Sequence, residues 1–164
     1  MIRAALLALA LASPAAAGTL EGRPVTFLVM AWDDPKAPFL EAPGHTVIVG
    51  DGAEFDFAPE GVYNGLIVVP MQVEIGQSRV EITYPSSGTG DFYGSAFNGY
   101  VLRFETDCVL FSGWKIDRDF TTLPVSDKDI FTDRGALYVN VAGMTYGPDK
   151  RIAIDLDVTD CPIS

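Results

Sequence analysis

Apolar and polar residues alternate with a period of two along most of this chain, and that alternation constrains its fold more than any other feature. Residues 79–84, RVEITY, and residues 151–158, RIAIDLDV, show it most clearly. Period two with Gly, Pro, Asn and Asp at the breaks is typical of half-buried strands. The pattern predicts an all-β fold of about nine short strands. Their spacing is typical of a sandwich or a closed barrel, of which we favour an antiparallel, jelly-roll-like β-sandwich.

The first 17 residues do not share this pattern. A short basic start precedes an unbroken run of Ala and Leu over residues 4–12, and residues 15–17 give the small-x-small sequence of a signal-peptidase site. The run is too short to cross a bilayer, which needs about 20 apolar residues. We therefore expect a signal peptide over residues 1–17 and a single domain over residues 18–164. The mature protein is then secreted or periplasmic.

The net charge excludes some classes of binding partner, and the cysteine content indicates the cellular compartment. The formal net charge is −11 at pH 7, which disfavours nucleic acid and anionic lipid. We expect no nucleic-acid partner and no membrane span. An even cysteine count in an exported chain favours a disulfide, here between Cys108 and Cys161. No Cys-x-x-Cys motif is present to support redox catalysis or a zinc knuckle.

The order of the strand and turn segments is similar to that of a known class of exported proteins. The segments TVIVGDGAEFDF, VEITY, FNGYVLRF, ALYVNVAG and IAIDLDV follow one another between Thr19 and Val158. In this order they resemble the β-rich ectodomain of exported bacterial proteins of the PEP-CTERM type. The sequence ends at Ser164 without the Pro-Glu-Pro-like motif, apolar helix and basic end of their sorting tail. The resemblance implies a released protein with a matrix- or surface-associated role, and it implies no catalytic residues.

One acidic stretch, VIVGDGAEFDF at residues 47–57, raises the question of a metal site. Asp-Gly supplies the positive φ angles of a tight hairpin turn, so we expect a hairpin here. In that register Phe55 and Phe57 face the core, while Glu54 and Asp56 share the outer face. The acids do not have the spacing of an EF-hand, but loops of a sandwich can assemble a site for Ca²⁺, which is the one candidate cofactor. The candidate metal ligands are Asp51, Glu54, Asp56, Asp155 and Asp157.

Aromatic residues near loops and strand ends suggest a binding site. Residues 84–99 and 118–135 are expected to be long surface loops, which often carry function. An aromatic ring can stack on a sugar while a nearby amide or carboxylate accepts hydrogen bonds from hydroxyl groups. The candidate ligand-binding residues are Phe92, Tyr93, Phe97 and Asn98, and the further aromatics near loops or strand ends are Trp32, Tyr100 and Trp114.

Motifs for catalysis are missing from the sequence. His45 is the single histidine, and there is no Gly-x-Ser-x-Gly elbow, phosphate loop or Gly-x-Gly-x-x-Gly turn. We therefore expect a secreted, non-catalytic binding or structural module, with an extracellular glycan or matrix component as its partner. Two alternatives remain open. One is a calcium-assisted carbohydrate-binding domain; the other is a glycan-active hydrolase, which needs two facing carboxylates about 5–10 Å apart.

Overall fold

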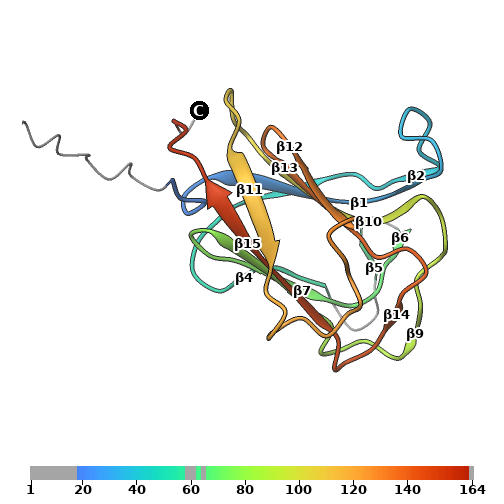
Figure 1. Cartoon of the computed structure of the whole chain (residues 1–164). Coiled ribbons are helices and arrows are strands. Elements are labelled where there is room, and N and C mark those ends of the chain that lie inside the picture. The colour runs from blue at the N-terminus through green and yellow to red at the C-terminus, as the bar shows by residue number, and fades with distance from the viewer. Residues whose placement is uncertain (1–17, 58–61, 64–65, 163–164) are drawn as a thin grey trace, which may run out of the picture.

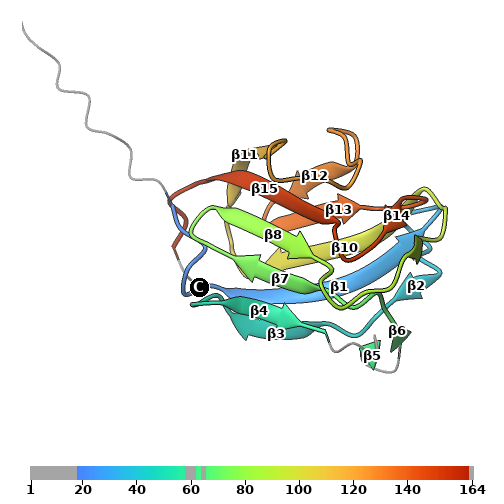
Figure 2. The same ribbon diagram turned by 90° about the horizontal axis from the view of Figure 1, so that it is seen from below.

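Two antiparallel sheets packed face to face make up the protein (Figures 1 and 2). The computed structural model describes residues 18–57, 62–63 and 66–162, and none of these residues is helical. The expected signal peptide, residues 1–17, lies outside the described residues. No described helix could therefore span a membrane.

The strands of the two sheets follow a non-sequential order. Sheet A runs β12 (Ile130–Asp133), β13 (Ala136–Asn140), β10 (Phe97–Phe104), β1 (Pro24–Trp32) and β2 (Leu40–Glu41), and β3 (His45–Ile48) also pairs with β1. Sheet B runs β11 (Phe111–Ile116), β15 (Arg151–Val158), β8 (Arg79–Thr83), β7 (Gln72–Ile75) and β4 (Ala53–Asp56). Two short ribbons pair β9 (Gly90–Asp91) with β14 (Thr145–Tyr146), and β5 (Val62–Tyr63) with β6 (Leu66–Ile67).

The predicted all-β sandwich is confirmed, with more strands than expected. The described residues form fifteen strands, of which five have only two residues, and a strand this short shows no alternation. The loop expected over residues 118–135 is wrong at its C-terminal end, because β12 occupies Ile130–Asp133 and pairs with β13. The loop expected over residues 84–99 is also wrong in part, because it contains the short strand β9 and its last three residues belong to β10, which begins at Phe97.

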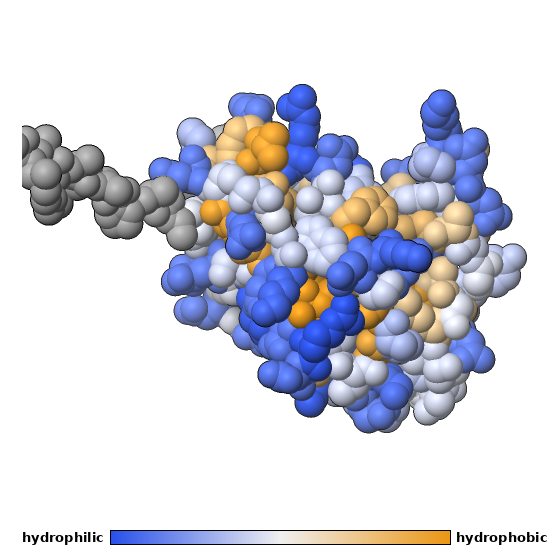
Figure 3. All heavy atoms as spheres, in the orientation of Figure 1, coloured by the Kyte–Doolittle hydropathy of each residue, from blue (hydrophilic) through white to orange (hydrophobic). Residues whose placement is uncertain are grey.

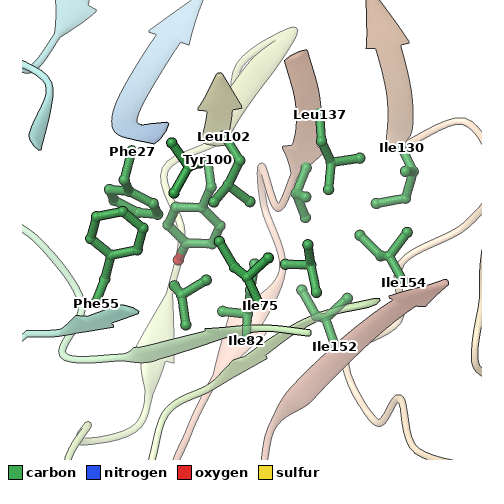
Figure 4. Packing of buried hydrophobic residues seen from close by; sticks show 14 of the residues in the cluster. Phe27, Phe55, Ile75, Ile82, Tyr100, Leu102, Ile130, Leu137, Ile152 and Ile154 are labelled. Carbon is green, nitrogen blue, oxygen red and sulfur yellow. The ribbon is translucent and has the colours of Figure 1, made fainter. Parts of the chain in front are cut away.

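The core lies between the sheets and includes the inner-face side chains that alternation predicted in β8 and β15, whereas Ile130 comes from the segment expected to be a loop (Figure 4). The labelled side chains of sheet A point toward those of sheet B. Burying each Val, Leu, Ile or Phe contributes about 1.5–3 kcal/mol. The central contributors are Phe27, Tyr100, Leu102, Ile130 and Leu137 from sheet A and Phe55, Ile75, Ile82, Ile152 and Ile154 from sheet B.

The acidic stretch over residues 47–57 is a corner between the two sheets, so the predicted hairpin is wrong. Strand β3 pairs with β1 in sheet A, whereas β4 pairs with β7 in sheet B. The turn chemistry is present, since Gly52 has a φ of 89°. The predicted facing of Phe55 and Phe57 is confirmed: both are buried, and their rings lie 5.2 and 5.1 Å from that of Phe27. These aromatic contacts link the segment that contains β4 of sheet B to β1 of sheet A.

The predicted disulfide between Cys108 and Cys161 is confirmed. It joins the chain after β15 to the loop between β10 and β11. The buried guanidinium of Arg23 holds the same region, because it donates hydrogen bonds to the carbonyls of Thr19 (2.6 Å) and Cys161 (2.5 Å). A disulfide is typical of proteins in oxidising compartments.

Candidate ligand-binding groove

The outer face of sheet B is charged, and Arg79 on this face is paired with three carboxylates. Arg79 on β8 donates to Glu81 at 2.6 Å and to Asp117 and Asp155 at 2.8 Å. The Arg79 guanidinium holds the pKa of Asp117 below its usual range. Hydrophilic residues also cover most of the surface seen in the orientation of Figure 1, with apolar residues in small patches between them (Figure 3). Neither feature leaves an apolar platform on this side.

The outer face of sheet A is apolar over parts of β1, β10 and β13. A second hydrophobic cluster, separate from the core, consists of Leu28, Phe97, Val101 and Ala136 on three neighbouring strands. Met30, Trp32 and Tyr138 pack against this cluster and are only partly buried. Strands β1 and β10 therefore carry apolar side chains on both of their faces.

A groove of about 230 Å³ lies on this outer face. Strands β1, β10, β12 and β13 supply its walls, together with Pro35 from the loop after β1. We call it the Trp32 groove, and its lining residues are Met30, Trp32, Pro35, Arg103, Phe131, Asp133 and Tyr138. Because the sheet holds these side chains on adjacent strands, the groove is formed without a ligand.

The aromatic rings of the groove are held in fixed orientations. The Trp32 indole stacks on the Phe97 ring, with centroids 3.9 Å apart and planes 9° apart, and Phe97 itself is only 2% exposed. Phe131 stacks on Tyr138 at 4.6 Å and is 39% exposed. The edge-to-face contact between Trp32 and Tyr138 spans 6.4 Å. Rings already fixed by packing lose little rotamer freedom when a ligand binds.

One cationic and one anionic side chain also line the groove. In the strand register, Arg103 lies opposite Ala136, and Ala136 lies opposite Asp133, so the two charged residues flank a small one. No side-chain hydrogen bond or ion pair within the described part of the chain involves Arg103 or Asp133. Their donors and acceptors are thus available to a ligand, unlike those of Arg79.

The structure does not bring the four predicted ligand-binding residues onto one surface. Phe92 belongs to the core, with its ring 4.9 Å from that of Tyr146. Phe97 is buried beneath Trp32. Tyr93 is 71% exposed, and its carbonyl accepts a hydrogen bond from the Asn98 amide at 2.8 Å. Only Tyr93 and Asn98 of the four remain at the surface. Of the three further aromatics named from the sequence, Trp32 lines the groove, Tyr100 is in the core and Trp114 packs against the core.

The five predicted metal ligands are divided between two places. Three lie at or beside β4 and two lie on β15, and β7 and β8 separate these strands. The Glu54 carboxylate accepts hydrogen bonds from the backbone N–H groups of Gly50 (3.1 Å) and Ile75 (2.6 Å), and the Asp56 carboxylate accepts a hydrogen bond from the side-chain amide of Gln72. Asp155 accepts one from Arg79. Within the described residues, no three His, Cys, Asp or Glu side chains gather in a way that could hold a metal ion.

Sequence reasoning named Trp32 as an aromatic near a strand end but missed Met30, Phe131 and Tyr138. The sequence of β1, PVTFLVMAW, contains a usable signal, because it has apolar residues at both odd and even positions and therefore on both faces of the strand. Such a strand is covered on both faces or has an apolar outer face.

No known family model, curated protein or solved structure matches the chain. The resemblance to the PEP-CTERM-type ectodomain therefore stays a prediction.

Proposed function

We propose that this protein is a secreted, non-catalytic binding module whose ligand lies in the Trp32 groove. The observation that carries the proposal is the contrast between the outer faces of the two sheets. On sheet B, Arg79 is paired with three carboxylates, whereas sheet A presents ordered aromatic rings beside one cation and one anion that have no side-chain partner within the described residues. Flat apolar area with a few polar groups is the usual composition of a ligand site.

The residues of the groove favour binding over hydrolysis. Asp133 is the single carboxylate among its lining residues, and glycoside hydrolysis requires a facing pair. Calcium-assisted binding has less support than direct binding, because Glu54 and Asp155 already accept hydrogen bonds from protein donors. The disulfide supports export, since such bonds persist in oxidising compartments.

Retention on immobilised polymers tests the proposal without knowledge of the ligand. Residues 18–164, produced by export so that the disulfide forms, are passed over neutral polysaccharide, acidic polysaccharide, peptidoglycan and denatured protein. We expect at least one polymer to retain the protein and Trp32→Ala to abolish that retention. Trp32 stacks on Phe97, so a thermal melt must show that the variant is folded, and Tyr138→Ala provides a second variant on a neighbouring strand.

The matched control is Tyr93→Ala, which removes an exposed aromatic ring outside the groove. Retention lost in Trp32→Ala but kept in Tyr93→Ala places the ligand in the groove. The reverse pattern would transfer the binding site to the loop over residues 84–99. A protein retained on none of the four polymers would contradict the proposal.

A further inference from the structure

We infer that the ligand of the Trp32 groove is a neutral carbohydrate, bound with one face of a sugar ring against the aromatic rings. This inference rests on the proposed function, which it makes specific. Two features of the groove carry it: the arrangement of the rings and the charge of the groups beside them.

The rings give the groove flat surfaces instead of a deep pocket. Trp32 lies on Phe97 and Tyr138 lies on Phe131, in each case with planes 9° apart. The two stacks meet edge to face, with 78° between the planes of Trp32 and Tyr138. A sugar ring has apolar C–H faces that match such a surface, because the face of an aromatic ring is electron-rich. The volume, about 230 Å³, is below the range of about 300–1,000 Å³ usual for drug-sized ligands, which fits a single ring of a longer chain.

The charged pair selects for a neutral ligand rich in hydroxyl groups. Arg103 supplies only donors and Asp133, as a carboxylate, only acceptors. Hydroxyl groups can do both, so neighbouring hydroxyls on one ring can satisfy the two residues together. The groove lining carries one positive and one negative group, and the whole chain has a net charge of −11. An acidic polymer is repelled by that charge, and so is a second copy of this chain.

Titration with soluble oligosaccharides tests the inference by NMR. The chain has two tryptophans, Trp32 in the groove and Trp114 on β11 of the opposite sheet. Each gives one indole N–H signal, and Trp114→Phe assigns them. The probes are tetramers of β-1,4-, β-1,3- and α-1,4-linked glucose, a galacturonic acid tetramer and a phenylalanine-containing peptide. We expect a neutral tetramer to move the Trp32 signal but not that of Trp114, with a Kd on the order of 1 mM for so small a contact.

The variants separate stacking from hydrogen bonding. Trp32→Ala removes the indole signal of the groove, so binding to this variant is followed by the backbone amide signals of the other lining residues. These amide signals should not respond to the tetramer. Asp133→Asn and Arg103→Gln each remove charge-assisted hydrogen bonds and should weaken the neutral tetramer by about three- to tenfold. Tyr138→Phe keeps the stacking ring and should bind within about twofold of the wild type, because the ring face supplies its contact. Tyr93→Ala, outside the groove, should leave the affinity unchanged.

The outcomes distinguish this inference from the proposed function. A Trp32 signal that no neutral tetramer moves, or a galacturonate tetramer or peptide that binds more tightly, overturns the inference. The proposed function survives that result if retention on a polymer still depends on Trp32. A neutral tetramer that binds equally well to folded Trp32→Ala overturns both.

Discussion

Reduction of the Cys108–Cys161 disulfide should lower the stability of the protein without changing its native structure. The bond closes a loop over a sequence separation of 53 residues, for which the chain-entropy model gives a loss of about 4 kcal/mol on cleavage. Two other contacts keep the C-terminal segment in place: the Thr159 hydroxyl donates to the Val109 carbonyl at 2.7 Å, and Arg23 donates to the Cys161 carbonyl. The effect therefore arises in the unfolded chain, which gains freedom when the bond is cut.

Thermal unfolding followed by circular dichroism, with and without a phosphine reductant, measures this loss. A change of about 4 kcal/mol corresponds to a fall in Tm of about 8–16 °C in a domain of this size, with an unchanged spectrum at 25 °C in the folded state. The double variant Cys108→Ala, Cys161→Ala serves as the control and should not respond to the reductant. A fall in Tm of less than about 3 °C in the reduced wild type would refute the reasoning, and so would loss of the native spectrum at 25 °C.

Three further predictions concern charged groups. Because the hydrogen bond from Arg79 lowers the pKa of Asp117 from its ordinary value, the ionised carboxylate stabilises the fold at pH values above that ordinary value, and this contribution is lost as the pH falls through the folded-state pKa. Asp117→Asn should therefore flatten the acid limb of a plot of urea midpoint against pH, and an unchanged limb would contradict this. Arg23→Met removes a buried cation that donates to backbone carbonyls near both ends of the described chain and should cost about 3 kcal/mol in urea unfolding, with Arg23→Lys costing less. Millimolar Ca²⁺ should leave the Tm equal to that in chelator, because Glu54 and Asp155 are bonded to protein donors; a rise of several degrees would return calcium to consideration.

The inner faces of the sandwich were predictable from the sequence, but the path between the sheets was not. Alternation locates strands such as β8 and β15 and assigns their buried residues correctly, because side chains of a strand point to opposite faces in turn. The Asp-Gly turn at Gly52 has the expected positive φ. That conformation is local, however, and serves a hairpin and a corner between sheets equally well. Which strands pair depends on distant contacts, such as that of Phe55 with Phe27.

The candidate site was harder to predict for a related reason. The expected surface loop over residues 84–99 made Phe92 and Phe97 candidate ligand-binding residues. Both rings are buried, since β9 pairs with β14 and the Phe97 ring lies under Trp32. Conversely, Tyr138 looks like an ordinary strand residue in ALYVN. Its role at the surface follows from the strand order, which places β13 two strands from β1. No local pattern contains that information.

The net negative charge of the protein can limit self-association without preventing a neutral ligand from binding in the groove. Charge repulsion between copies of the chain acts at a distance, whereas the aromatic rings act only on contact. An exposed apolar sheet face favours self-association, and here the central strands β1 and β10 contribute to such a face. A net charge of −11 keeps copies of the chain apart at distances up to about 8–10 Å, the Debye length at moderate salt. A neutral ligand does not experience this repulsion and can reach the rings. Raising the salt concentration should therefore promote self-association while leaving the affinity for a neutral oligosaccharide unchanged.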